Sequence, residues 1–172
     1  MKADIVAGYS HSVEVLTELD LVEYAIPDFA NTLAAAGKQV TFGQRTQLAS
    51  EQNLHEQALK GRRVAIVSDA TLRAEAMDIQ GCNELDELVA SGRWAEVAVP
   101  IDRKGSYVNV SILYGVPGAN AGGDAYRINE RFMSMATARV MSSQDAPHLL
   151  LMDGNVAQKE YTSKRCRRRQ FD

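Results

Sequence analysis

An aspartate and an asparagine directly follow the last apolar run of the chain. The run extends from His148 to Met152, and Asp153 and Asn155 come after it, separated by one glycine. Near-continuous apolar bulk over five residues predicts a buried strand. Because side chains alternate along an extended chain, the two polar groups are expected to point the same way. A carboxylate and an amide placed together can hold a hard cation, accept a proton or bind a phosphate oxygen, and they can equally form a turn.

A hairpin is predicted upstream of this pair. Apolar and polar residues alternate over residues 95–101 and again over residues 108–114, with a turn over residues 102–105 between them. This pattern indicates two antiparallel strands with one buried face. The predicted inward residues are Ala95, Val97, Val99, Ile101, Val108, Val110, Ile112 and Tyr114. Tyr114 therefore ends a strand, either as a core residue or as a contact for phosphate.

A long helix is predicted between the hairpin and the final strand. A glycine-rich loop over residues 115–123 leads to a helical period over residues 124–142, with Asp124 as its N-cap. The predicted buried face is Ile128, Phe132, Met135 or Ala136, and Val140. The order is thus a hairpin that ends at Tyr114, a glycine-rich loop, a long helix, and a strand that leads to Asp153.

The first half of the chain gives weaker patterns. Strands are predicted at residues 3–7, 40–42 and 63–67, and helices at residues 12–23 and from Pro27 to a stop at Gly37. Residues 44–60 indicate a loop or a frayed helix, and residues 70–92 fit neither period. The chain has no internal repeat, so we expect one domain of mixed α and β structure over residues 1–162.

Charge separates this body from a short basic tail. The chain has 19 basic and 22 acidic residues, of which five basic and one acidic lie in the last ten, so residues 1–162 carry a net charge of −7. The basic residues of the tail are Lys164, Arg165, Arg167, Arg168 and Arg169. We expect residues 163–172 to be disordered and to be the only strong attractor for nucleic acid. No membrane-spanning run or signal peptide is recognised, which favours an intracellular location, cytoplasmic or nuclear.

The order and spacing of these motifs resemble a known superfamily. Residues 110–118 read Val-Ser-Ile-Leu-Tyr-Gly-Val-Pro-Gly and residues 150–155 read Leu-Leu-Met-Asp-Gly-Asn. Together with residues 61–68 and 91–94, they are similar to the endonuclease/exonuclease/phosphatase, or deoxyribonuclease I-like, superfamily. The endonuclease domains of non-LTR retrotransposons are the most similar members. The resemblance implies an α/β sandwich of two mostly antiparallel sheets packed face to face and flanked by helices, incomplete at the C-terminus. An incomplete sheet is expected to leave an exposed edge and an apolar patch.

The resemblance also implies a chemistry and assigns roles to residues. It implies hydrolysis of a phosphodiester or a phosphomonoester by a water that Mg²⁺ activates. Asp153 would be a general base or metal ligand, Asn155 would orient the phosphate, and Tyr114 would contact it. The metal-binding glutamate of the superfamily follows a first strand that reads Ala-Asp-Ile-Val-Ala-Leu-Gln-Glu, and aligning residues 3–7 with it puts Ser10 at the glutamate. Glu14 lies one helical turn further on.

Two hypotheses for the function follow from this comparison. The first is a metal-dependent phosphodiesterase that acts on nucleic acid. The second is a non-catalytic remnant, or a nucleic-acid-binding module that uses the basic tail, because the glutamate and a C-terminal histidine and aspartate are not found. The number of acidic residues at the site separates the two hypotheses.

Overall fold

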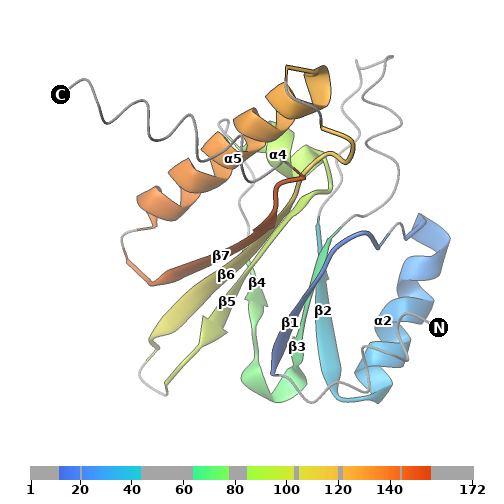
Figure 1. The fold of residues 1–172 in the computed structure, drawn as a ribbon. Coiled ribbons are helices and arrows are strands. Elements are labelled where there is room, and N and C mark those ends of the chain that lie inside the picture. The colour runs from blue at the N-terminus through green and yellow to red at the C-terminus, as the bar shows by residue number, and fades with distance from the viewer. Residues whose placement is uncertain are drawn as a thin grey trace.

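Two β-sheets pack face to face between helices (Figure 1). The computed structural model describes residues 12–19, 21–43, 64–77, 85–102, 105–119, 122–143 and 145–155. The elements are β1 (Val13–Leu16), η1 (Glu23–Ala25), α2 (Ile26–Ala35), β2 (Lys38–Phe42), β3 (Ala65–Asp69), η2 (Ala70–Leu72), β4 (Glu75–Ala76), α4 (Asp86–Ala90), β5 (Trp94–Pro100), β6 (Tyr107–Tyr114), α5 (Asp124–Ser142) and β7 (His148–Asp153). The predicted α/β sandwich is confirmed. Among the described residues, no helix combines the length and apolar character needed to cross a membrane.

The N-terminal sheet has the strand order β1-β3-β2, with both pairs antiparallel. α2 covers its outer face, where Phe29 and Leu33 pack against Ala65 and Val67 of β3. The helix begins with a proline in its first turn, and Gly37 follows its end with a φ of 74°, which glycine adopts without strain. The predicted helix after Pro27 and the strands near residues 40–42 and 63–67 are therefore confirmed.

The prediction of a helix over residues 12–23 is wrong, because the segment begins with strand β1. Val13 and Val15 pack against the core between the sheets, whereas Leu16 packs on the side of α2. The apolar spacing of three residues in this segment also fits a helix, but pairing with β3 makes the two-residue alternation decisive. The predicted strand at residues 3–7 and the predicted loop at residues 44–60 lie outside the described residues.

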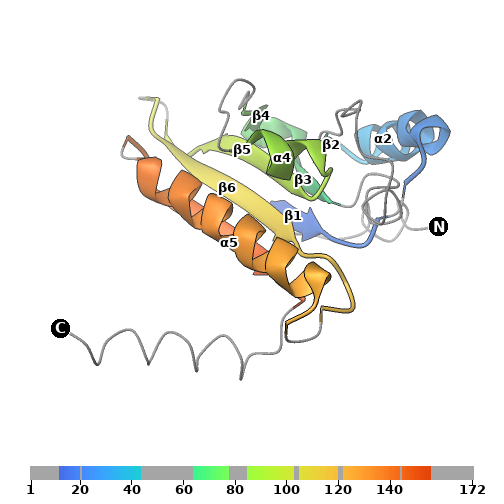
Figure 2. The ribbon, with the colours of Figure 1, turned by 90° about the horizontal axis from the view of Figure 1, so that it is seen from above.

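The second sheet has the strand order β4-β5-β6-β7, with the predicted hairpin at its centre. β5 and β6 pair antiparallel, with Val97 opposite Val110. β6 and β7 run parallel, and the chain crosses from one to the other through α5, which lies on the outer face of the sheet (Figure 2). This parallel crossover brings Tyr114 and Asp153 into register as neighbours at the ends of their strands.

Both faces of the hairpin are buried, so the prediction of a single buried face is wrong. The inner face forms the core between the sheets, with Val64 and Ile66 against Ala95, Val97, Val99, Val110, Ile112 and Tyr114. The outer face carries Trp94 and Leu113, which α4 and α5 cover. Ile101 was predicted to be inward, but it follows the last residue of β5 and is 61% exposed. The rule that one face of an alternating strand is exposed to solvent does not hold for a sheet that helices cover on its second face.

The bounds of α5 agree with the prediction, whereas its cap and its buried face differ. Gly123 is the N-cap, and no side chain caps the helix. The buried residues are Tyr126, Asn129, Phe132, Met133 and Ala136. The buried face is thus rotated from the predicted one, because Asn129 of α5 is completely buried and its side chain hydrogen-bonds to Val116 in the loop before the helix.

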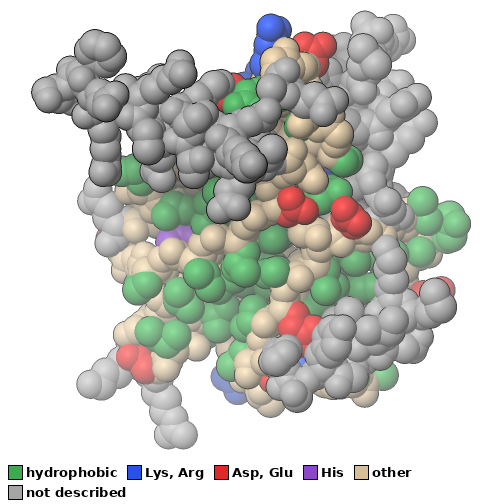
Figure 3. Space-filling view, in the orientation of Figure 1, with side chains coloured by type: hydrophobic (Ala, Val, Ile, Leu, Met, Phe, Trp, Pro, Cys, Tyr) green, Lys and Arg blue, Asp and Glu red, His purple; other side chains and the backbone are tan. Residues whose placement is uncertain are grey.

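β7 lies at the edge of its sheet and is not the buried strand that its composition predicted. Leu149 is 53% exposed and Met152 is 46% exposed. Next to them, an apolar groove of about 270 Å³ opens between the sheets, lined by Val13, Val15, Val99, Val108, Val110, Leu149 and Leu151. Apolar side chains gather on this face of the molecule (Figure 3). Within the described residues, the expected sheet edge and apolar patch are therefore present.

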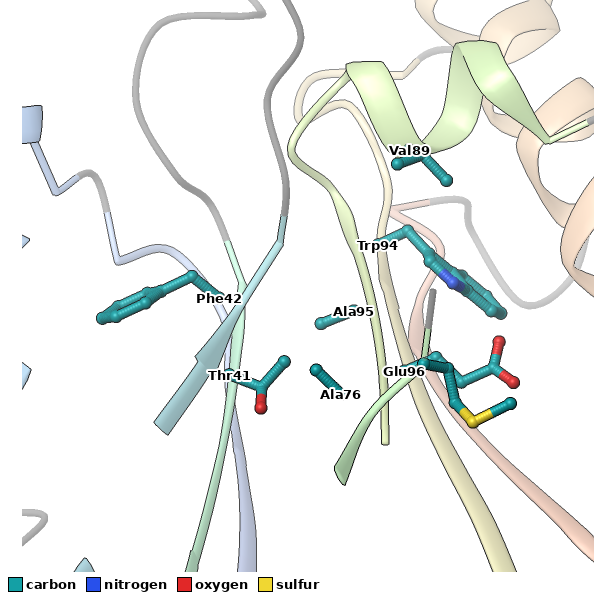
Figure 4. A pocket seen from close by; sticks show the side chains of 8 residues that line it. Thr41, Phe42, Ala76, Val89, Trp94, Ala95 and Glu96 are labelled. Atoms are coloured by element: carbon teal, nitrogen blue, oxygen red, sulfur yellow. The ribbon is translucent and has the colours of Figure 1, made fainter. Parts of the chain in front are cut away.

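A second, much smaller cavity lies between the sheets near Trp94 (Figure 4). Its volume is about 20 Å³, and Thr41, Phe42, Ala76, Met77, Val89, Trp94, Ala95 and Glu96 line it. This volume is enough for about one water molecule. The cavity is consequently a packing defect and not a substrate site.

His148 ties the edge strand β7 to β6 and α5. Its Nε2 lies 2.5 Å from the Ser111 hydroxyl, and its Nδ1 lies 3.1 Å from the Ser143 hydroxyl. Burial lowers the pKa of His148 below its ordinary value of 6.5. The Arg139 cation also lowers this pKa, whereas the Glu96 carboxylate acts against the shift. The folded protein therefore favours neutral His148.

The contribution of His148 to stability is expected to fall as the pH drops below about 6.5. A histidine whose pKa is lower in the folded state than in the unfolded state stabilises the fold fully at a pH above its unfolded-state pKa. This stabilisation is lost as the pH falls from the unfolded-state pKa to the folded-state pKa. The stability advantage of the wild type over His148→Gln should thus be larger at pH 7.5 than at pH 5.5. The change should stay below about 1.4 kcal/mol per pH unit, because solvent screens a half-buried ring. Urea denaturation at the two pH values measures it, and an advantage that does not change with pH would contradict the prediction.

Candidate functional site

A hydrogen bond between the two sheets marks the candidate site. Tyr114, the last residue of β6, is 3% exposed and belongs to the core between the sheets. Its hydroxyl donates to Oε1 of Glu18 at 3.1 Å, and Glu18 follows β1 by two residues. Tyr114 is thus a core residue whose hydroxyl reaches a carboxylate, and its contact with phosphate stays a prediction.

The environment of the Tyr114 phenol favours its protonated form. Burial raises the pKa of Tyr114, and the hydrogen bond to Glu18 and the negative charge of that carboxylate raise it further. The hydrogen bond from the Asn155 amide and the positive charge of Arg93 lower it, but by less. Tyr114 therefore remains a hydrogen-bond donor at neutral pH, next to an anionic oxygen.

Asp153 and Asn155 reach the same end of the sheet by different routes. Asp153 ends β7 opposite Tyr114, and its side chain is exposed. Asn155 lies beyond the strand with a φ of 48°, so the alternation expected of an extended chain does not apply to it. The Asn155 backbone N–H donates to Asp153 Oδ1 at 3.1 Å, which is the turn predicted as the alternative role of this pair. The pair therefore forms a turn and also lies beside Tyr114.

Gly115 joins these residues in a tight approach of two loops. Its N–H donates to the backbone carbonyl of Asp153 at 2.6 Å, and its own carbonyl accepts from the Asn155 amide at 2.9 Å. A Cβ at Gly115 would lie 2.5 Å from the carbonyl oxygen of Gly154. Only glycine fits this position, because the backbone of the second loop occupies the space of a side chain.

Asn129 of α5 fixes the residue after this glycine. Its Oδ1 accepts from the Val116 N–H at 2.6 Å, and its Nδ2 donates to the Val116 carbonyl at 3.0 Å. The side chain is completely buried, so these two bonds are formed away from water. The helix thus holds the loop that follows Tyr114 in one conformation, which sequence periodicity did not reveal.

Glu18 is the residue that sequence reasoning missed. Aligning the first strand with residues 3–7 placed Ser10 at the expected glutamate, but the described strand that precedes the site is β1. After this strand, Leu16-Thr17-Glu18 repeats the Leu-x-Glu spacing expected there. The signal was present in the alternation of Val13 and Val15, which a helical interpretation obscured.

Glu14, the other acid considered near the first strand, does not belong to the site. Its carboxylate lies 3.8 Å from the Lys38 ammonium, and both side chains are buried. Lys38 also pairs with Asp69 at 2.9 Å. Glu14 therefore has a structural role, and rearrangement to reach the site would break this pair.

The oxygen ligands at the site fit a hard divalent cation. Glu18 and Asp153 supply two carboxylates, and Asn155 supplies an amide. Mg²⁺ is commonly bound by one or two carboxylates together with waters and phosphate oxygens of the substrate. Among the described residues, no group of three or more histidine, cysteine, aspartate or glutamate side chains could enclose a metal ion. The five cations of the tail, which were predicted to contact nucleic acid, lie outside the described residues.

Several solved structures have a fold similar to that of this chain. The chain is similar to a humanized TDP2 of D. rerio, with a TM-score of 0.57 and 11% identity over 94% of this chain and 56% of that one. It is also similar to the human Nocturnin catalytic domain, with a TM-score of 0.56 and 15% identity over 94% of this chain and 57% of that one. A third similar structure is sphingomyelinase C from Streptomyces griseocarneus, with a TM-score of 0.59 and 16% identity over 94% of this chain and 60% of that one. No protein-family model and no curated protein matches the sequence.

These structures are members of the endonuclease/exonuclease/phosphatase superfamily, so the resemblance noted in the sequence is confirmed at the level of the fold. The chain spans 56% to 60% of the length of these three structures. The TM-scores of 0.56 to 0.59 establish a common fold, whereas identities of 11% to 16% leave the reaction to be argued from the site.

Proposed function

The chain has the endonuclease/exonuclease/phosphatase fold, and we propose that it is a metal-dependent hydrolase of phosphodiesters in nucleic acid. The proposal depends mainly on the hydrogen bond between Tyr114 and Glu18. This bond brings a carboxylate from one sheet to the strand end that carries Asp153 and Asn155 on the other. A carboxylate, a second carboxylate, an amide and a phenol at one end of a sandwich are a suitable set for phosphoryl chemistry.

Glu18 and Asp153 would hold Mg²⁺. The bound ion would neutralise negative charge on the phosphate and make a bound water more acidic. Ser10, the residue that the alignment placed at the glutamate, has no charge and could not have this role. Glu18 answers one of the arguments from sequence for a remnant without activity, because it supplies a second acid where the alignment gave only Ser10.

The other side chains have separate tasks in the proposed reaction. Asp153 is exposed, so its carboxylate is accessible to a water and accepts the proton of that water as it attacks. The Asn155 amide is held by the Gly115 carbonyl and orients the scissile phosphate. The Tyr114 hydroxyl stays protonated and donates its one proton to Glu18 in the free site, and it would turn this proton to a phosphate oxygen when Glu18 holds the ion. Each role needs the geometry that the two loops around Gly115 impose.

Nucleic acid is the proposed substrate, as in the non-LTR retrotransposon endonucleases that the sequence resembles. Residues 1–162 carry a net charge of −7, which repels a polyanion at long range. The cations of the tail, four of them arginines, would supply the phosphate contacts: Lys164, Arg165, Arg167, Arg168 and Arg169. The substrate is therefore expected to bind with strong salt dependence.

Cleavage of supercoiled and abasic plasmid DNA in Mg²⁺ or Mn²⁺ tests the proposal. We expect the wild type to cleave, and Asp153→Ala to cleave about 1,000-fold more slowly, because the general base and one metal ligand are lost. Asp145→Ala is the matched control, since Asp145 is an exposed aspartate before the other end of β7 and should have no effect. EDTA should abolish all cleavage.

The same assay distinguishes the enzyme from a binding module. A chain that binds DNA through its tail but does not cleave it at any metal concentration would contradict the proposed function. Deleting residues 163–172 should weaken DNA binding and reduce its salt dependence, while hydrolysis of a small phosphodiester such as bis(p-nitrophenyl) phosphate stays unchanged. Equal cleavage by the wild type and by Asp153→Ala would show that Asp153 only forms a turn.

A further inference from the structure

A buried arginine lies directly beneath the candidate site. Arg93 precedes β5 and is 1% exposed. Its guanidinium carbon is 5.2 Å from the centroid of the Tyr114 ring, which is within the range of a cation–π contact. Its backbone carbonyl accepts the Tyr114 N–H at 2.9 Å. Both the main chain and the side chain of Arg93 therefore constrain Tyr114.

The Arg93 side chain also reaches the residue that connects the two loops. Its Nη1 donates to the Gly115 carbonyl at 2.7 Å and lies 3.3 Å from the Tyr114 carbonyl. The same Gly115 carbonyl accepts the Asn155 amide at 2.9 Å. One buried oxygen is thus shared between a guanidinium below the site and an amide within it.

We propose that Arg93 is a positioning residue that fixes Asn155 and Tyr114 through the Gly115 carbonyl. A hydrogen bond from a charged donor is stronger than a neutral one, and it is strongest where water is excluded. By holding the Gly115 carbonyl in one direction, Arg93 sets the direction in which the Asn155 amide must point. This inference depends on the proposed function for its consequence in catalysis, but not for its geometry.

Only arginine fits these contacts among the natural cations. Its planar group has donors in a fixed fork and stacks on an aromatic ring, and it keeps its charge when buried. Lysine offers a single point of charge on a flexible stem, so Arg93→Lys would keep the charge and lose the geometry. Arg93→Met keeps most of the volume and loses both. The two variants therefore separate charge from orientation.

The test measures the Asn155 side chain directly by ¹H–¹⁵N NMR. Its amide resonances are those that disappear from the spectrum of Asn155→Asp. We expect Arg93→Met to shift these resonances and to speed hydrogen exchange of the amide protons, and Arg93→Lys to do so partly. In the DNA cleavage assay, kcat should fall about 10- to 100-fold with KM within about twofold, because misplacement affects the transition state and not substrate capture.

Trp94→Phe is the control for loss of stability alone. Trp94 is the next residue and is also buried, but it packs against α4 and α5 and not on the site. If Arg93→Met lowers the melting temperature as Trp94→Phe does and leaves the Asn155 resonances unchanged, Arg93 is only structural and the inference is wrong. If Arg93→Met does not fold, the melting temperature and the Asn155 resonances of Arg93→Lys are compared with those of Trp94→Phe, and the same outcomes support or contradict the inference. If Arg93→Met shifts the Asn155 resonances but the wild type cleaves no DNA, the proposed function is refuted and the positioning role of Arg93 stands.

Discussion

Glu18→Gln is expected to reduce metal-dependent phosphodiester hydrolysis by about three orders of magnitude. The substitution removes one negative charge at the proposed cation site and keeps the size of the side chain. Its amide oxygen can still accept the Tyr114 hydroxyl, so the contact between the sheets is preserved. We expect weaker Mn²⁺ binding, measured by electron paramagnetic resonance, together with a lower kcat, and only a small change in the melting temperature.

Glu14→Gln is the matched control for this prediction. Glu14 lies in β1, four residues before Glu18, and its carboxylate pairs with buried Lys38 and not with Tyr114. Loss of this pair should lower stability while Mn²⁺ affinity stays at the wild-type value. Equal Mn²⁺ affinity in the wild type and Glu18→Gln would show that the glutamate is a structural partner of Tyr114 and that the cation, if bound, is held elsewhere.

The second half of the chain could be predicted well because local and tertiary preferences agree there. Two alternating strands, a glycine loop and a helical period specify β5, β6 and α5, and the structure has α5 at residues 124–142 as expected. The parallel pairing of β7 with β6 follows from a helix between two strands. The sequence thus placed Tyr114 at the end of one strand and Asp153 at the end of another, and the structure shows that these two strands are neighbours.

The first strand could not be predicted because two periods compete in the same residues. Apolar residues spaced by three favour a helix, and only the pairing with β3 selects the strand. Since the position of Glu18 depends on this choice, the error in the element became an error in the site. The misread segment therefore left Glu18 out of the acids counted at the candidate site.

The burial of several polar side chains could also not be predicted from the sequence. Asn129, Ser111 and Glu96 are each at most 4% exposed, although their residue types favour the surface. Each has a specific partner that lies far away in sequence, such as Val116 for Asn129. A pattern of apolar residues cannot report such partners, so the buried face of α5 was rotated in the prediction.

Arg139→Met is expected to lower the free energy of unfolding by about 3–5 kcal/mol. Glu96 is in the centre of β5 with its side chain fully buried beneath α5. Its two carboxylate oxygens accept from Arg139 at 2.8 and 3.1 Å, a two-point contact that fixes the helix on the sheet. Without the arginine, the carboxylate is left buried without its charged partner, and its desolvation is not offset. Urea denaturation at pH 7 measures the loss.

The double variant Glu96→Leu/Arg139→Met shows whether the loss comes from the orphaned charge. Replacing both partners with apolar side chains removes the desolvation cost, so we expect most of the lost stability to return. Arg127→Met is the surface control: Arg127 is 74% exposed and lies 3.8 Å from Asp124, so its loss should cost less than about 0.5 kcal/mol. A double variant as unstable as Arg139→Met would mean that the aliphatic stem of Arg139, and not the buried carboxylate, holds α5 against β5. In that case the helix that carries Asn129 would depend on apolar packing alone for its position above the site.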